Sequence, residues 1–296
     1  MTKEGRLYQP KIIKEVMDQA GLHFTKSLGQ NFLIDGNIVR QIAHAARLGE
    51  EDRVLEIGPG IGTLTEELLL HAGKVLSVEI DRTFIGVLQD RFGDRDNFLL
   101  MEGDALKLDL APVLAQAAPG RSWKLVANLP YYITAPLLER FLRTDLPIES
   151  LTVMVQKEVA DRIMARPSTP DYGSLTLFVA LYADPIRAFE VPRTAFMPAP
   201  KVDSTVLVLK RRPAGEGELS PEDRDRVNGI IRLAFQQRRK MVIKAIQRGT
   251  GMDRRQVEEA FEARGLSTKA RAENLQLEDF RHILQSLGYI KTTSKM

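Results

Sequence analysis

Three alternate glycines that follow a short aliphatic run give the clearest chemical signal in the sequence. Residues 54–57 are the aliphatic run, the glycines are Gly58, Gly60 and Gly62, and residues 63–70 have the composition of a helix. A hydrophobic run, a glycine turn and a helix begin a nucleotide-binding βαβ unit. Glycine suits this turn because a side chain would block the ligand, and because the turn needs φ values that other residues avoid. The Gly-x-Gly-x-Gly spacing differs from the Gly-x-Gly-x-x-Gly of dinucleotide folds.

Acidic residues follow the next two hydrophobic runs. Residues 74–78 precede Glu79, about 20 residues beyond the first glycine, where an acidic side chain accepts hydrogen bonds from ribose hydroxyls. Residues 97–101 are followed by Gly103 and Asp104. The ends of successive parallel strands lie at one edge of a sheet, so the glycine loop, Glu79 and Asp104 predict a site for an adenosyl ligand. The alternative is ordinary strand-end turns, which also favour Gly and Asp.

A fourth hydrophobic run, 124–127, ends in Asn128-Leu129-Pro130-Tyr131. The exocyclic amine of a nucleobase is a poor nucleophile because its lone pair is delocalised into the ring. The Asn128 side-chain oxygen and the Leu129 carbonyl are two acceptors for its N–H groups, and Tyr131 can stack on the base. These groups predict methyl transfer to a base amine. The catalysis would come from positioning the amine against the methyl group, and no strong general base would be needed. A base inside a helix would first have to be unstacked. The alternative is a proline-bounded strand end with a packed tyrosine.

The elements that must position these residues alternate between strands and helices. This alternation predicts an α/β fold with a doubly wound, mostly parallel sheet, closed by an antiparallel edge. The predicted strands are 54–57, 74–78, 97–101, 124–127 and 151–156, followed by 175–182 and 205–210. The predicted helices are 10–21, one that begins near 35–37, 63–70, 83–92, 109–118, 135–143 and 157–166. The segment 26–33 is predicted to be a loop over the ligand.

A linker and a change of charge predict a second domain. Residues 213–221 are rich in Pro, Gly, Glu and Ser, which predicts domains at 1–212 and 213–296. The second domain is predicted to be all helical, with helices at 221–236, 238–248, 253–263 and 276–287. Residues 210–296 hold 19 Lys and Arg against 12 Asp and Glu, whereas the rest of the chain holds 23 against 27. This balance favours a polyanionic partner.

One basic stretch in the second domain is a candidate for contact with nucleic-acid phosphates. Its residues are Arg238, Arg239, Lys240, Lys244 and Arg248. The alternative is a solvated helix face.

The bulk properties exclude several classes of protein. The 296 residues are 44% hydrophobic and 27% charged, which is an ordinary globular composition. The chain has no apolar run of the length that a transmembrane helix needs, and residues 1–9 lack the apolar core of a signal peptide. Cysteine is absent, which favours a reducing cytoplasm. The four histidines show no metal-binding spacing. We therefore expect a cytoplasmic protein with no metal and no membrane partner.

Four stretches of the chain, in the right order, resemble the ribosomal RNA adenine N6-dimethyltransferase family. They are Ser-Leu-Gly-Gln-Asn-Phe-Leu at 27–33, Glu-Ile-Gly-Pro-Gly-Ile-Gly at 56–62, Asn-Leu-Pro-Tyr at 128–131 and Phe-Met-Pro-Ala-Pro-Lys-Val-Asp-Ser at 196–204. Residues 234–240 and 271–275 resemble the C-terminal signatures of the same family. The resemblance covers nearly the whole chain and is strongest to the bacterial small-subunit members.

The resemblance implies a Rossmann-like class I methyltransferase fold and S-adenosylmethionine as the methyl donor. It implies as acceptors two adjacent adenosines in the 3′-terminal hairpin of 16S rRNA, each dimethylated during small-subunit biogenesis. By matching position, the donor is bound by Asn31, Leu33, Gly58, Gly60, Glu79, Asp104 and Asn128, where Glu79 holds the ribose and Asp104 the adenine amine. The target base is held by Asn128, Leu129, Pro130 and Tyr131, with Phe196 as a second stacking face.

Two other functions remain open at this point. The related large-subunit (23S) enzymes of the macrolide-resistance type usually have Ile in place of Leu129 and a shorter C-terminal part, so the sequence favours the small-subunit group. A non-catalytic ribosome-assembly factor of the same fold is the other alternative, and the intact 128–131 motif and glycine loop argue against it. The expected partner is 16S rRNA or the immature small subunit, bound by a monomeric protein.

Overall fold

The computed structural model describes residues 5–21, 31–212 and 219–291 of the chain. Two compact units are present: Met1–Ala160 with Ile186–Arg211, and Asp161–Pro185 with Arg212–Met296. The segment Asp161–Pro185 therefore packs with the second unit, although the sequence placed it within 1–212. Residues 213–218 of the predicted linker and residues 26–30 of the predicted ligand loop lie outside the described residues.

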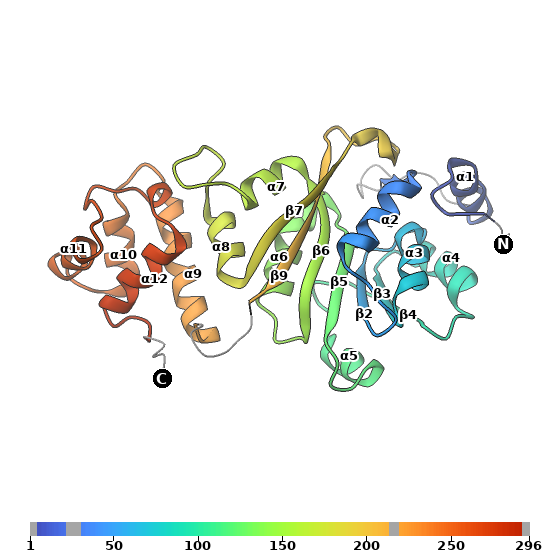
Figure 1. Ribbon diagram of the computed structural model, residues 1–296, viewed down its shortest axis with the longest axis horizontal. Coiled ribbons are helices and arrows are strands. Elements are labelled where there is room, and N and C mark those ends of the chain that lie inside the picture. Colours follow the sequence, from blue (N-terminus) through green and yellow to red (C-terminus); the bar gives the residue numbers. More distant parts are fainter. Residues whose placement is uncertain (1–4, 22–30, 213–218, 292–296) are drawn as a thin grey trace. The chain divides into compact units, whose positions relative to one another are not determined.

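A seven-stranded sheet forms the centre of the first unit (Figure 1), and its strand order is β4-β3-β2-β5-β6-β9-β7. Strands β2 to β6 pair in parallel, and β9 runs antiparallel to β6. The predicted mostly parallel sheet with an antiparallel edge is confirmed. The strands are β2 Arg53–Ile57, β3 Lys74–Glu79, β4 Phe98–Glu102, β5 Trp123–Asn128, β6 Ile148–Gln156, β7 Ala183–Val191 and β9 Ser204–Arg211.

The central strands form because their aliphatic residues are buried on both faces of the sheet, as in other parallel sheets. Leu55 of β2 pairs with Leu76 of β3 and with Leu125 of β5, so the three strands are in register. Their carboxyl ends therefore lie at one edge. A backbone hydrogen bond joins β2 to β3 at this edge, where Gly58 N donates to Val78 O at 3.0 Å.

Helices alternate with the parallel strands of the first unit along the chain. Two of them have aspartate N-caps: Asp35 accepts from Asn37 N and Ile38 N, and Asp81 accepts from Thr83 N. Helices α3 and α4 pack against β3 and β4. The helices are α1 Pro10–Gln19, α2 Gly36–Ala45, α3 Thr63–His71, α4 Arg82–Phe92, α5 Ala111–Ala117, α6 Thr134–Leu142 and α7 Lys157–Ile163, with the 3₁₀ turns η2 Tyr131–Ile133 and η3 Arg193–Ala195.

A two-stranded ladder joins two of the sequence motifs. Strand β1, Phe32–Leu33, pairs antiparallel with β8, Phe196–Met197, so that Phe32 lies opposite Met197 and Leu33 opposite Phe196. The sequence predicted a loop for the first of these segments. The short strand forms because residues 196–197 supply its hydrogen-bond partners. This partner lies far away in the sequence, so local sequence patterns do not reveal the pairing.

The prediction of a strand at 175–182 was wrong, because these residues form helix α8, Ser174–Tyr182. Most of the helix is buried, so it has no polar face. A short apolar run of this kind has no periodicity that separates a buried helix from a buried strand. Thr176 Oγ1 accepts from Gly173 N at 3.1 Å and so caps the helix start. Strand β7 begins directly after Tyr182, at residues where no strand was predicted.

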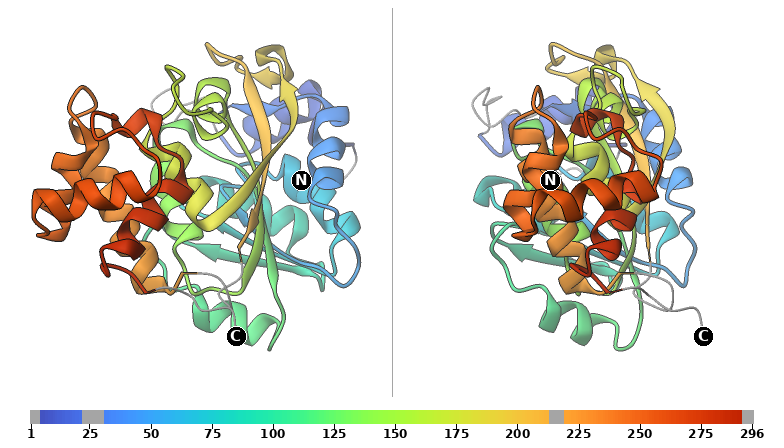
Figure 2. Two further views of the ribbon diagram at one scale, coloured as in Figure 1. Left: turned by 60° about the vertical axis from the view of Figure 1, so that its left-hand side comes forward. Right: turned by 90° about the vertical axis from the view of Figure 1, so that its left-hand side faces the viewer.

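The second unit is helical beyond residue 219, as predicted. Its helices are α9 Pro221–Gln236, α10 Val242–Thr250, α11 Arg254–Ala263 and α12 Leu277–Ser286, with the 3₁₀ turn η4 Ala272–Asn274. These helices form one group in both views of Figure 2. Val227, Ile246, Phe261 and Phe280 are fully buried among them. Helix α10 begins at Val242, so Arg238 to Lys240 lie in the preceding turn and not in the predicted helix 238–248.

Candidate active site

A cavity opens at the carboxyl edge of β2, β3 and β5. It encloses about 920 Å³ of empty space, a volume that includes the open solvent at its mouth. Nine predicted site residues line it: Asn31, Leu33, Gly58, Gly60, Glu79, Asn128, Leu129, Pro130 and Tyr131. The structure thus gathers residues from four separate sequence motifs around one space, as expected from the shared strand edge.

The glycine loop needs its glycines for conformation and for space. Gly58, Gly60 and Gly62 have φ values of 67°, 58° and 90°, which side chains disfavour. A Cβ on Gly62 would lie 2.5 Å from Phe92 Cε2, and one on Gly60 would lie 3.2 Å from Phe32 Cε1. The loop therefore lies close to the helix and strand around it, and its backbone forms part of the cavity wall.

Glu79 is buried at the end of β3 and accepts three backbone hydrogen bonds. Its Oε2 accepts from Gly60 N at 3.0 Å, and its Oε1 accepts from Ile80 N and Asp81 N at 2.9 Å each. Burial raises the pKa of Glu79, and the three N–H groups act against that rise. The carboxylate is thus fixed against the glycine loop at the wall of the cavity.

Glu56 also lines the cavity, although sequence analysis gave it no separate role. It is buried in β2, where its Oε2 accepts from Ser77 Oγ at 2.6 Å and Thr65 Oγ1 at 2.7 Å. Its Oε1 has no hydrogen-bond partner among the described residues. Burial raises the pKa of Glu56 to about 7, an effect that the two hydroxyls oppose and the Glu79 charge strengthens. A glutamate in the middle of an aliphatic strand was the signal that could have identified it.

The Asn128 side chain is held at the wall of the same cavity by a hydrogen bond. Its Nδ2 donates to Asn31 O at 3.4 Å, which links β5 to the segment before β1. The next residue, Leu129, is buried, and its N–H donates to Met154 O of β6 at 3.2 Å. The backbone that presents the two predicted acceptors is therefore anchored to the sheet on one side.

Tyr131 is half-buried at the start of η2 and lines the same cavity. Its hydroxyl shares a hydrogen bond of 2.7 Å with Ser204 Oγ at the start of β9. Burial raises the pKa of Tyr131, so the phenol is neutral. Thr134 Oγ1 donates to Pro130 O at 3.1 Å and closes the turn that carries the tyrosine.

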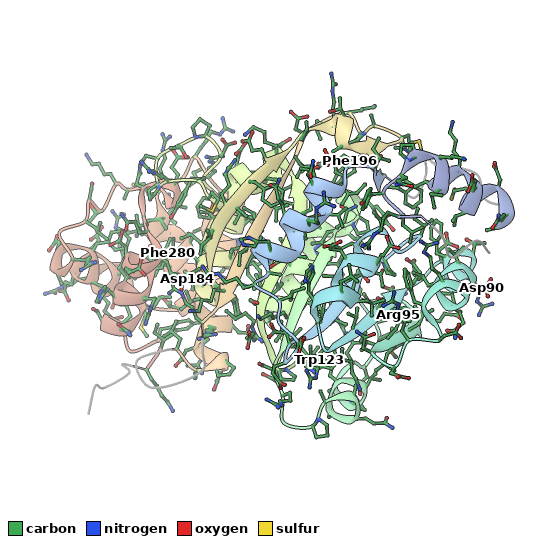
Figure 3. The ribbon with its side chains drawn as sticks, turned by 45° about the vertical axis from the view of Figure 1, so that its right-hand side comes forward. Asp90, Arg95, Trp123, Asp184, Phe196 and Phe280 are labelled. Carbon is green, nitrogen blue, oxygen red and sulfur yellow. The ribbon has the colours of Figure 1, made fainter. Side chains whose placement is uncertain are left out.

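Asp104 and Phe196 are the two predicted site residues that do not line the described cavity. Asp104 Oδ1 accepts from Leu106 N at 2.9 Å, so the carboxylate caps a local turn. Phe196 is only 3% exposed and belongs to the hydrophobic core. Figure 3 places it and Trp123, the first residue of β5, at opposite ends of the first unit. A stacking role for Phe196 would require the ring to become exposed.

Several cavity residues were not predicted. Ile80 and Tyr132 both lie on the cavity wall, and each is 62% exposed. The Phe32 ring lies edge-on to Phe84, with centroids 5.8 Å apart. Exposed apolar side chains at the mouth of a cavity are suited to contact flat ligands. Within the described ranges, no three His, Asp or Glu side chains gather as a metal site requires, and no helix is long and apolar enough to cross a membrane.

Comparison with known proteins agrees with this geometry. A family model described as "Ribosomal RNA adenine dimethylase" matches residues 21–288. A protein from Moorella thermoacetica named "Ribosomal RNA small subunit methyltransferase A" is 44% identical over 278 residues, covering 92% of this chain and 95% of that protein.

Two solved structures share the fold. A dimethyladenosine transferase from Plasmodium falciparum has a TM-score of 0.69 and 26% identity, covering 87% of this chain and 98% of that one. The 23S rRNA methyltransferase ErmE has a TM-score of 0.67 and 28% identity, covering 87% of this chain and all of that one. The expected class I methyltransferase fold is confirmed, and the chain belongs to the ribosomal RNA adenine dimethylase family.

Proposed function

We propose that the protein dimethylates the N6 amines of two adjacent adenosines in the 3′-terminal hairpin of 16S rRNA during small-subunit biogenesis. The observation that carries this proposal is one cavity that the glycine loop, Glu79 and residues 128–131 line together. The choice of the small subunit is supported by Leu129, by the length of the helical C-terminal part and by the names of relatives such as the Moorella protein.

The residues of the cavity fit S-adenosylmethionine, the methyl donor of this family. When bound, the donor supplies a methyl group that is activated by a positively charged sulfur. Glu79 accepts from the ribose hydroxyls, and Asn31, Leu33, Gly58 and Gly60 form the surrounding wall. The Glu56 Oε1 atom is a buried oxygen with no partner among the described residues, so it is available to a polar group of the donor. Asp104 remains our proposed contact for the adenine amine.

In the same cavity, Asn128 and Leu129 prepare the amine of the target base. Their two oxygens accept its N–H groups and turn the nitrogen lone pair toward the methyl group, which is catalysis by orientation. Tyr131 stacks on the base, and we retain Phe196 as a second face. The amine proton becomes acidic once the nitrogen is alkylated, so no side chain must act as a strong base. The adenosine has to leave its helical stack to reach these groups.

We assign RNA binding to the helical domain, 213–296, and methyl transfer to the domain 1–212. Arg239, Lys240, Lys244 and Arg248 are exposed in the second unit, where they can contact phosphates. Arg238 already donates to Glu273 and to the Pro170 carbonyl, so its role is partly structural. The proposed enzyme is a monomer of the cytoplasm that acts on 16S rRNA in an immature small subunit.

Nucleoside mass spectrometry on 16S rRNA from a deletion strain tests this proposal. Addition of the protein and S-adenosylmethionine should produce dimethyladenosine at two adjacent positions. Primer extension on both ribosomal RNAs separates the alternatives, because the similarity to ErmE makes a 23S target the second candidate. A stop only in 23S rRNA would favour that candidate, and no modification in either RNA would favour a non-catalytic assembly factor.

A further inference from the structure

We propose that Ser204 is a positioning residue for the methyl transfer, because it holds the Tyr131 ring in place before the target base arrives. This inference rests on the proposed function and deepens it, since it assigns a role to a residue outside the cavity wall. The sequence motif 196–204 contributed only Phe196 to the predicted site.

The geometry that supports this role is a hydrogen bond between the half-buried Tyr131 and a fully buried serine. Ser204 is 0% exposed, and its Oγ lies 2.7 Å from the Tyr131 hydroxyl. This bond restricts the far end of the tyrosine ring, because breaking it leaves the buried Ser204 hydroxyl without this partner. The half-buried ring therefore keeps one orientation while part of it lines the cavity.

The strand that carries Ser204 is firmly anchored. Ser204 pairs with Gln156 in the antiparallel ladder between β9 and β6. The preceding residue, Asp203, accepts at its carbonyl from Lys157 N at 3.0 Å and at its Oδ1 from Arg193 N at 2.9 Å. A side chain on such a rigid element fixes its partner more accurately than one on a loop.

The neighbouring tyrosine shows what Tyr131 would be without this bond. Tyr132 lies in the same 3₁₀ turn and is 62% exposed, and its hydroxyl has no hydrogen-bond partner among the described residues. The two consecutive tyrosines thus differ in burial and in bonding: Tyr131 is half-buried and meets Ser204, whereas Tyr132 is exposed. A mobile ring has to be ordered when the base binds, and the conformational entropy that it loses makes the reaction less favourable.

A double-mutant cycle with Ser204→Ala and Tyr131→Phe tests the inference. Tyr131→Phe keeps the ring and removes the hydroxyl, so both variants remove the same bond. We expect each to lower kcat by about 3- to 10-fold, with little change in KM for S-adenosylmethionine. The double variant should be no slower than either single one, because one interaction is lost in all three. The substrate is the unmodified small ribosomal subunit.

Thr205→Val provides a matched control one residue along the strand. Thr205 is buried, and its Oγ1 has no hydrogen-bond partner among the described residues. Its replacement should leave kcat at the wild-type value. An equal loss of kcat in Thr205→Val would show that the integrity of the strand matters and not the hydrogen bond. If the losses of the two single variants multiplied in the double variant, the two side chains would act independently. Either result would overturn the inference, as would a wild-type kcat in Ser204→Ala.

Crystal structures of the wild type and of Ser204→Ala provide a readout that does not depend on turnover. We expect one Tyr131 rotamer in the wild type and several rotamers in the variant. A single unchanged rotamer in both would contradict the positioning role. If the wild type methylates no ribosomal RNA, the proposed function fails, and the rotamers still decide whether Ser204 orients Tyr131.

Discussion

Charged side chains are placed differently at the cavity edge of the first unit and on the helices of the second unit. At the cavity, Glu56 and Glu79 are buried and accept from hydroxyls or backbone N–H groups. In the second unit, charges pair along exposed helix faces. Arg255 and Glu259 of α11 lie 2.9 Å apart, and their side chains are 89% and 60% exposed.

This difference indicates where single residues matter. An exposed pair contributes about 0–1 kcal/mol, because water solvates both charges nearly as well as they solvate each other. A buried carboxylate is costly unless each of its oxygens has a partner. We therefore expect large effects from single changes at the cavity, and small additive effects in the second unit.

Asn128→Ala should have the largest effect on kcat. The amide supplies an acceptor for the reacting amine, and loss of one such group lowers kcat on the order of 100- to 1,000-fold. Single-turnover methylation of small subunits measures this change, and RNA binding should be retained. A loss of less than tenfold would remove Asn128 from the chemistry.

Glu56 should make stability depend on pH. Its pKa is raised to about 7 in the folded protein, against an ordinary value of 4.5 for glutamate, so between these pH values the folded state holds a proton that the unfolded state has lost. Stability from this group is complete below pH 4.5 and declines as the pH rises through 7, by about 3 kcal/mol in all.

Glu56→Gln should remove this part of the pH dependence. Urea unfolding of the wild type and the variant at pH 4.5 and pH 8 measures the difference. Parallel changes with pH in the two proteins would show that Glu56 is already ionised in the folded state at low pH.

Glu79→Ala should weaken the binding of S-adenosylmethionine by on the order of 100-fold, which abolishes methylation, because hydrogen bonds to a charged group are lost. RNA binding should survive. Glu102 is a matched control, since it pairs with Glu79 in the β3–β4 register but is exposed and bonded to Arg82. Calorimetric titration of both variants checks this assignment. Retained turnover in Glu79→Ala would contradict the ribose contact.

Tyr131→Ala removes the ring and not only its hydroxyl. Stacking of a base on an aromatic ring is worth about 1–3 kcal/mol, so turnover should fall by roughly 5- to 150-fold. This loss should exceed that of Tyr131→Phe, and the same methylation assay compares them. Equal rates in the two variants would limit the role of Tyr131 to its hydroxyl.

The smallest effects should come from the second unit. Lys244→Ala or Arg248→Ala should weaken RNA binding modestly and reduce the slope of log K against log salt by about 1. Arg255→Ala is the control, because that side chain is paired with Glu259. Filter binding at several salt concentrations measures the slopes. An equal reduction of the slope in Arg255→Ala would show that the effect comes from the overall charge of the protein and not from a phosphate contact.

The sequence predicted the parts of the site that depend on local order. The glycine loop, Glu79 and Asn128 each follow a hydrophobic run, and parallel strands bring such ends to one edge. Two features depended on contacts between distant segments and were not predicted: the β1–β8 ladder and the Tyr131–Ser204 bond. The same limit explains helix α8, whose apolar residues are typical of either a buried helix or a buried strand.

A crystal structure with S-adenosylmethionine, or with an unreactive analogue of it, tests the central claim most directly. The account predicts that the ribose hydroxyls lie within hydrogen-bond distance of the Glu79 carboxylate, with the donor extending toward Asn128. A donor bound outside this cavity, or an Asn128 side chain that points away from it, would contradict the account.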